Sequence, residues 1–240
     1  MGSIKKIKKI QLLRKLENYP IFTFNEFVRI AGMPKEYARL YLFRLKKDEL
    51  IFQIERGKYT VFDDPLVFSS QIATPSYISF WTALRFYNLT EQLPIDVMVA
   101  SFKSRKTLDF QGTMIRFYKI KHLLGYKKER YSKFSLFIAE KEKAIIDSLL
   151  LKNVVFDEII KAVKKKDFDL KKLVNYAIKT KNKSLMKRIG FILESFHLDA
   201  SKFLKYLDNN YIPLDCGASK DGKAVKKWKI IENRRIHDIN

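Results

Sequence analysis

The chain has 240 residues, of which 47% are hydrophobic, so it can bury the core of one large domain or of two modest ones and is not a disordered protein. Its 48 Lys and Arg residues against 26 Asp and Glu residues give a net charge of +22. We therefore expect a polyanionic partner, with nucleic acid ahead of a membrane surface. A single cysteine, Cys216, excludes an intramolecular disulfide.

The sequence also bears on where the protein acts. No stretch reaches the roughly 18 uninterrupted apolar residues of a membrane-spanning helix, because Arg85 interrupts the best candidate, residues 77–89. The N-terminal lysines are not followed by the apolar block and small-residue cleavage site of a secretory signal. We expect a cytoplasmic protein without a membrane partner.

The N-terminal residues have the pattern of two helices. Isoleucine and leucine return at three- and four-residue spacing over residues 4–18, which predicts an amphipathic helix with a basic outer face. Thr23 and Glu26 have the spacing of a capping box, and Gly32 is typical of the residue that ends a helix. A short second helix is therefore expected between Thr23 and Gly32.

A third helix is expected from Pro34, which suits a first helical turn, to about Asp48. Its apolar residues Ala38, Leu42 and Leu45 recur at helical spacing and should face inward. The outer face has the basic and aromatic side chains expected of a DNA recognition helix, namely Lys35, Tyr37, Arg39, Tyr41 and Arg44.

Two short strands, residues 50–54 and 59–62, are predicted to form a hairpin around a glycine turn. Three helices followed by a hairpin predict a winged helix-turn-helix over residues 1–65. In this interpretation Arg56 and Lys58 lie at the wing tip and reach a minor groove or the DNA backbone. The Asp-Asp-Pro sequence at 63–65 would then be a short linker.

Residues 66–240 have a mixed pattern, which predicts a second domain of mixed α/β structure with a small sheet and a helical part. The whole chain is therefore expected to belong to the α+β class. A helix is expected after Ser76 or Ser79. The other expected elements are strands at 95–100, 114–120 and 134–138, helices at 140–151, 154–164, 170–179, 185–196 and 200–207, and strands at 211–214 and 225–231. The pattern leaves open whether this part divides near residue 150.

Four segments of the second part carry a further signal. They are SYISFWTALRFYNLTEQLP at 76–94, FIAEKEKAIIDSL at 137–149, KRIGFILE at 187–194, and YIPLD at 211–215 with Lys227, Trp228 and Asn233 after it. Together they resemble the AbiEi-family antitoxins, the wing-bearing transcriptional regulators of type IV toxin–antitoxin and abortive-infection systems. The family pattern has glycine where this chain has Asn88, and proline where it has Lys141.

The resemblance implies a transcriptional autorepressor that binds inverted repeats in its own promoter and acts as an antitoxin. It further implies a cognate nucleotidyltransferase-like toxin, encoded beside it, that is opposed without a required stable complex. A single winged helix reads only a few base pairs, so a homodimer on the double-stranded operator DNA is a further expectation.

Residues that could carry catalysis are few. His122, His197 and His237 stand far apart in the sequence, and none has a cysteine or histidine at metal-ligand spacing. Asp167 and Asp169 could hold Mg²⁺ as in a nuclease, but they follow a run of lysines and are better explained as helix caps. We therefore expect no enzyme activity, no metal and no cofactor.

Several alternatives stay open. The chain could be a ligand-responsive transcription factor without a toxin or, with less support, a nucleic-acid-processing enzyme. The lysines of residues 152–187 could form a second nucleic-acid surface or only a solvated face. Lys143 and Asp147 have the spacing of a helical ion pair, and Trp228 fits a core position better than a base-stacking one.

Overall fold

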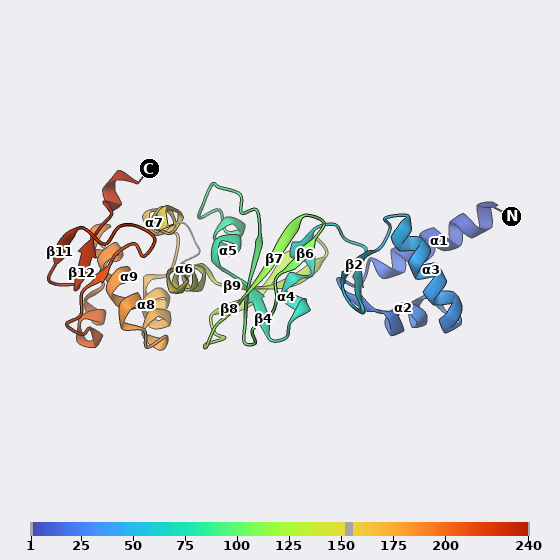
Figure 1. The fold of residues 1–240 in the computed structure, drawn as a ribbon, viewed down its shortest axis with the longest axis horizontal. Helices are drawn as coiled ribbons and strands as arrows, with labels where there is room; N and C mark the ends of the chain where they lie inside the picture. Colours follow the sequence, from blue (N-terminus) through green and yellow to red (C-terminus); the bar gives the residue numbers. More distant parts are fainter. Residues whose placement is uncertain (1, 152–155, 240) are drawn as a thin grey trace.

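The computed structural model describes residues 2–151 and 156–239, and Figure 1 shows them as an elongated molecule that follows the sequence from one end to the other. Three sheets and the helices that pack on them give a mixed α+β fold. No helix in the described ranges is both long and apolar enough to cross a membrane.

The N-terminal end consists of three helices, α1 (Gly2–Leu16), α2 (Phe24–Ala31) and α3 (Lys35–Lys47). The predicted capping box is confirmed, since the Thr23 side chain accepts from the Glu26 N–H and the Glu26 carboxylate accepts from the Thr23 N–H. These hydrogen bonds from Thr23 hold the pKa of Glu26 below its ordinary value. Gly32 ends α2 at a φ of 60°, a conformation that glycine adopts without strain.

A three-stranded antiparallel sheet packs behind these helices, in the order β1-β3-β2. Its strands are β1 (Phe22–Thr23), β2 (Phe52–Glu55) and β3 (Lys58–Thr60), so the expected hairpin is present and β1 is an addition to it. Phe22 and Ile51 pack with the inner faces of the helices in one buried cluster, which fixes the sheet to the helices.

The middle of the molecule is a six-stranded mixed sheet in the order β6-β7-β5-β4-β9-β8 (Figure 1). Its strands are β4 (Ser76–Ile78), β5 (Val97–Ser101), β6 (Leu108–Phe110), β7 (Thr113–Lys119), β8 (Tyr126–Tyr131) and β9 (Phe134–Ala139). Ser76 therefore begins a strand and does not cap a helix. The following helix is α5 (Phe80–Phe86), with Ser79 at its N-cap position.

The central strand β5 is buried on both faces, and its residues alternate between two cores. Met98 and Ala100 face the large core that contains α5 and the C-terminal helices. Val97 and Val99 face a second core on the opposite side, with the 3-10 helix η1 (Pro65–Val67) and α4 (Ser69–Ile72). Both faces of the sheet are thus covered.

The second core also receives the N-terminal hairpin. Phe52, Ile54 and Phe62 pack into it, with the Phe52 ring 6.1 Å from Phe110 and the Phe62 ring 5.2 Å from Phe134. The hairpin is therefore enclosed between its own helices on one side and the six-stranded sheet on the other. Residues 63–65, expected as a linker, are fixed as well, because Asp64 caps η1.

Asp64 also links the segment after β3 to β8 of the six-stranded sheet. Its second carboxylate oxygen accepts a hydrogen bond from the Tyr131 hydroxyl at 2.6 Å. Burial of Tyr131 and this hydrogen bond raise the pKa of the phenol to about 12. The phenol consequently stays protonated and donates the bond throughout the physiological pH range.

The C-terminal third consists of α6 (Lys141–Leu150), α7 (Phe156–Lys164), α8 (Leu170–Lys179) and α9 (Lys183–Ser195), then the 3-10 helix η2 (Ser201–Tyr206) and a small sheet. That sheet has the order β10-β12-β11, with β10 (Ile212–Pro213), β11 (Lys223–Val225) and β12 (Ile230–Glu232). The strand expected over 225–231 is thus two strands joined by a turn. The first two residues of the helix expected over 154–164 lie outside the described residues.

One continuous core runs through this third and into the middle sheet, from Tyr77 to Ile239. Helix α6 contributes Ala144, Ile145 and Ile146 to it, all fully buried. Residues on both sides of position 150 therefore share a single hydrophobic interior.

Candidate nucleic-acid interface

Helix α3 presents one face to the N-terminal core and the other to solvent. Ala38, Leu42 and Leu45 are buried against α1 and α2, as their spacing predicts. Of the residues expected on the opposite face, four are exposed and Tyr41 is half-buried. The exposed four are Lys35, Tyr37, Arg39 and Arg44.

Aromatic rings hold part of this outer face in a defined arrangement. Tyr37 stacks on Tyr41 with 6.0 Å between ring centroids and an interplanar angle of 10°. The Arg39 guanidinium lies 5.8 Å from the centre of the Phe24 ring at the start of α2, within cation–π range. These contacts reduce the side-chain entropy that would be lost when the face binds a partner.

The structure adds apolar side chains to this face that the sequence analysis missed. Leu40 is 46% exposed and Phe43 is 62% exposed, although both are large hydrophobic residues. Lys47 is exposed one turn beyond Phe43. Their positions are opposite Ala38, Leu42 and Leu45 on a helical wheel, so the same periodicity could have identified them.

The hairpin turn separates Arg56 from Lys58. Arg56 is exposed, and no ion pair of its guanidinium is found among the described residues. Lys58 makes contacts within the protein that the sequence does not predict: its amine is 3.1 Å from Glu55 and donates to the Ile72 carbonyl at 2.8 Å. The Lys58 side chain, which is 32% exposed, therefore bonds to the protein itself.

Glu55 connects the hairpin to the middle sheet. Its carboxylate pairs with both Lys58 and Arg105, and Arg105 lies just before β6. Burial of Glu55 opposes its ionisation, but the hydrogen bonds from Lys58 and Arg105 outweigh burial and hold its pKa below the ordinary value. The base of the hairpin is thus fixed in place by charge as well as by apolar packing.

Two residues of the segment at 137–149 lie inside the molecule. Lys143 and Asp147 form the expected pair, with side chains 3% and 0% exposed. The other Asp147 oxygen accepts hydrogen bonds from Tyr77 at 3.1 Å and Ser79 at 2.7 Å. Helix α6 is therefore bonded to β4 and to the start of α5 through one buried carboxylate.

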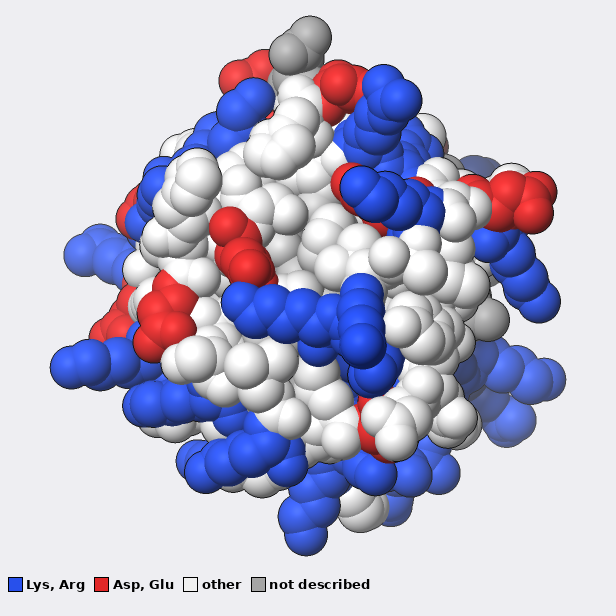
Figure 2. Space-filling model, turned by 90° about the vertical axis from the view of Figure 1, so that its left-hand side faces the viewer, with Lys and Arg blue, Asp and Glu red and all other residues white. Residues whose placement is uncertain are grey.

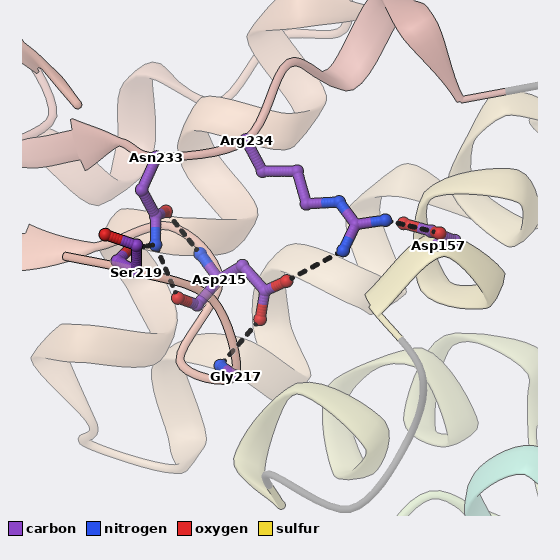
Figure 3. A network of polar contacts seen from close by, with 6 residues as sticks. All are labelled: Asp157, Asp215, Gly217, Ser219, Asn233 and Arg234. Carbon is purple, nitrogen blue, oxygen red and sulfur yellow. Dashed lines mark hydrogen bonds and ion pairs between the residues drawn. The ribbon is translucent and has the colours of Figure 1, made fainter. Parts of the chain in front are cut away.

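The closing segments of the chain also meet in space, as Figure 3 shows. The Asn233 side chain accepts from the Asp215 N–H at 2.9 Å and donates to the Asp215 carbonyl at 2.8 Å. Arg234 bonds to Asp157 of α7 at 2.6 Å and lies 3.4 Å from Asp215. This network fixes the loop between β10 and β11 to the end of β12 and to α7.

Trp228 occupies the core position that the sequence favoured. It is 2% exposed, packs against Gly190 of α9, and its indole N–H donates to Glu194. A side chain at Gly190 would overlap the Trp228 ring, which is why the helix has glycine at this position.

The two departures from the family pattern fall at positions with a simple conformational explanation. Asn88 has a φ of 55°, in the left-handed region that glycine occupies most readily and asparagine tolerates. Lys141 is the first residue of α6, the position in a helix where proline is favoured.

The candidate catalytic carboxylates have structural partners. Asp169 caps α8 by accepting from the Lys172 N–H at 3.1 Å, as predicted, and Asp167 pairs with Lys141 at 2.7 Å. Glu142, which is buried, accepts from the Asp169 N–H at 2.7 Å. Within the described ranges, no group of three or more His, Cys, Asp and Glu side chains is placed to hold a metal ion.

Lys and Arg side chains do not gather into one patch at the C-terminal end of the molecule. Figure 2 shows that end with basic side chains projecting around the rim and others lying across the middle, separated by uncharged surface and by acidic side chains. The outer face of α3 at the opposite end of the molecule is thus the better-defined candidate surface.

Comparison with known proteins gives a match in fold. The structure is similar to the crystal structure of the RV2827C protein from Mycobacterium tuberculosis, with a TM-score of 0.66. The match covers 93% of this chain and 90% of that chain at 8% sequence identity, so the likeness concerns the fold alone. No family model and no curated protein matches the sequence.

Proposed function

We propose that this chain is a sequence-specific DNA-binding protein whose residues 1–65 form a winged helix-turn-helix with α3 as the recognition helix. The observation that carries the proposal is the outer face of α3, an exposed helix supported by two others and a sheet. A helix must be supported in this way before it can enter a major groove.

The chemistry of this face suits DNA. Arg39 and Arg44 can donate to guanine edges or to phosphates, and Lys35 near the helix N-terminus can contact the backbone. Leu40 and Phe43 supply the apolar surface that reads a thymine methyl group. Arg56, which is exposed at the hairpin turn, could reach the flanking backbone.

The test is a fluorescence anisotropy titration against the DNA upstream of the chain's own gene and against a scrambled duplex, at about 150 mM salt. We expect the upstream DNA to bind at least about a hundredfold more tightly. The double variant Arg39→Ala and Arg44→Ala should remove the difference, whereas Lys202→Ala with Lys226→Ala, the same loss of charge at distant exposed positions, should keep it. Equal binding of both duplexes would refute sequence specificity.

We further propose that the protein represses its own promoter and is the antitoxin of a type IV toxin–antitoxin system, with a nucleotidyltransferase-like toxin as its counterpart. The resemblance of its four segments to the AbiEi family supports this proposal. The conformations of Asn88 and Lys141 support it too, since both positions suit the residues of the family pattern.

Co-expression with the neighbouring toxin gene tests this second step. We assign neutralisation to residues 66–240, which contain the four segments that resemble the AbiEi family. Growth should therefore be restored by the chain and also by its Arg39→Ala and Arg44→Ala variant. If the unaltered chain failed to restore growth, the antitoxin proposal would be refuted, and the alternative of a transcription factor not linked to a toxin would stand. The enzyme alternative has less support, because Asp167 and Asp169 are engaged in an ion pair and a helix cap.

A further inference from the structure

A cavity of about 520 Å³ lies between the middle sheet and the C-terminal helices, far from α3. Its wall is formed by the segment after β7, by α6, and by the turn between α8 and α9. The volume falls in the range of roughly 300–1,000 Å³ that is typical of small-molecule sites.

Cations are concentrated around this cavity. Lys119 and Lys121 lie on the sheet side, and Lys181 and Lys183 lie on the helix side. Within the described part of the chain, Lys119, Lys121 and Lys181 have no carboxylate at ion-pair distance. Lys183 is only loosely held, at 3.7 Å from Asp208. Like charges in one concave surface raise the local positive potential and attract an anion.

The acidic group in the lining does not offset these cations. Asp147 is fully buried, and both of its oxygens are already used, one by Lys143 and the other by Tyr77 and Ser79. The first turn of α9 adds to the positive potential, since Lys183 and Ser184 follow its N-cap at Asn182 and line the cavity.

Apolar and aromatic side chains form another part of the lining, beside the polar His122 and Thr180. Leu124, Leu150 and Leu151 contribute aliphatic side chains, and Tyr176 contributes a ring. The Tyr176 hydroxyl donates to Glu140 at 2.7 Å, which fixes the orientation of that ring. A ligand that fits this lining has both a strongly anionic group and a flat or apolar body.

We infer that this cavity binds a nucleotide, with its phosphates between Lys119, Lys121 and Lys181 and its base on the apolar side near Tyr176. Lysine is a common point-charge ligand of phosphate, and a helix N-terminus favours the same group. The site is a small-molecule site on the second part of the chain, and it stands whether or not α3 binds DNA.

Isothermal titration calorimetry of the full chain at about 150 mM salt tests the inference, with ATP and GTP as probes and adenosine and inorganic triphosphate as separated parts. We expect one saturable site per chain for at least one of the two nucleotides. Adenosine should not bind measurably, and triphosphate should bind more weakly than the nucleotide.

A matched pair of variants locates the site. The triple variant Lys119→Ala, Lys121→Ala and Lys181→Ala should weaken binding at least about tenfold, since each cation contributes a charge-assisted contact. The control triple variant changes the exposed residues Lys171, Lys202 and Lys226 to alanine and should bind as the unaltered chain does. All six side chains are exposed, so both variants should keep the melting temperature of the parent.

Three results would overturn the inference. The first is the absence of saturable binding with both ATP and GTP. The second is an equal loss of nucleotide affinity in the two triple variants, which would mean that binding depends only on the overall charge of +22. The third is binding of a short RNA through Lys119, Lys121 and Lys181 without binding of either nucleotide, which would make this surface a nucleic-acid contact.

Discussion

The ring of Trp228 occupies the space that a Cβ atom at Gly190 would need, so that the turn before β12 packs closely on α9. Gly190→Ala places a methyl group that overlaps the edge of that ring. We expect the free energy of unfolding to fall by about 1–3 kcal/mol, as in other overpacked cores. Urea denaturation measures it, and Gly190→Ala combined with Trp228→Leu should recover part of the loss. An unchanged midpoint in the single variant would contradict the tight contact.

The buried pair of Lys143 and Asp147 gives a second prediction. Asp147→Ala leaves the Lys143 amine buried without its counter-charge and removes the acceptor for Tyr77 and Ser79. We expect a loss of about 3–5 kcal/mol in the free energy of unfolding. Lys143→Met together with Asp147→Leu should lose less than Asp147→Ala alone, because no charge then remains buried. If the double variant were less stable than Asp147→Ala, the hydrogen bonds and the ion pair of the network would stabilise the fold by more than the burial of its charges costs.

The stability of the hairpin base should depend on pH through Glu55. Its pKa is lower in the folded protein than in the unfolded chain, where it is about 4.3. The contribution of Glu55 is therefore complete above that unfolded value and is lost as the pH falls through the lower, folded one. Glu55→Gln should reduce the free energy of unfolding at pH 7 by about 1–2 kcal/mol. The loss should shrink as the pH is lowered through the folded pKa of Glu55. A loss of stability that does not change as the medium is acidified would mean that the shape of the Glu55 side chain, and not its charge, holds the hairpin.

The two cations of the hairpin should separate DNA affinity from stability. On the proposed function, Arg56→Ala should weaken DNA binding and reduce the slope of log K against log salt by about 0.9, the value for one phosphate contact. Lys58→Ala should instead lower the melting temperature, since its amine bonds to Glu55 and to the Ile72 carbonyl. Anisotropy at several salt concentrations, beside thermal denaturation, compares the two. The same salt slope for Lys58→Ala and Arg56→Ala would place both side chains on the DNA.

The Asn233 network gives a prediction for the C-terminal end. Asn233→Ala removes the partner of the Asp215 N–H and of the carbonyls of Asp215 and Ser219. We expect a loss of about 1–3 kcal/mol, the range for leaving such groups unsatisfied. Asn233→Asp keeps the acceptor and loses the donor, so it should fall between the alanine variant and the parent. Stability equal to the parent in Asn233→Ala would show that water replaces the side chain fully.

The parts of the fold that could be predicted from the sequence are those with local signals. The capping box of Thr23 and Glu26, the Gly32 stop and the inward spacing of Ala38, Leu42 and Leu45 all depend on neighbours within one or two helical turns. Asp169 as a helix cap is a signal of the same local kind.

The missed elements have weak or misleading local patterns. β1 has two residues, too few to show any periodicity. β8 reads Tyr-Lys-Lys-Glu-Arg-Tyr and lies at the edge of its sheet, where charged residues are favoured and the apolar alternation disappears. Ser76 resembles a helix cap because Ser and a following apolar run occur in both settings, and only the pairing of β4 with β5 distinguishes them.

The candidate site could be predicted only in part for a similar reason. The exposed face of α3 follows from helical periodicity, but the inward turn of Lys58 depends on Ile72, 14 residues later. The cavity depends on lysines from position 119 to position 183 that only the tertiary structure brings together. Long-range contacts of this kind leave no mark in a short window of sequence.

The enclosure of the hairpin between helices and sheet bears on how the chain can be divided in the laboratory. A fragment ending at Pro65 would expose Phe52, Ile54 and Phe62, which lie in the second core, and such a surface favours aggregation. A cut near residue 150 would divide the core that runs from Tyr77 to Ile239. Calorimetry should accordingly give one melting transition for the full chain, and limited proteolysis should yield no stable pieces at either boundary.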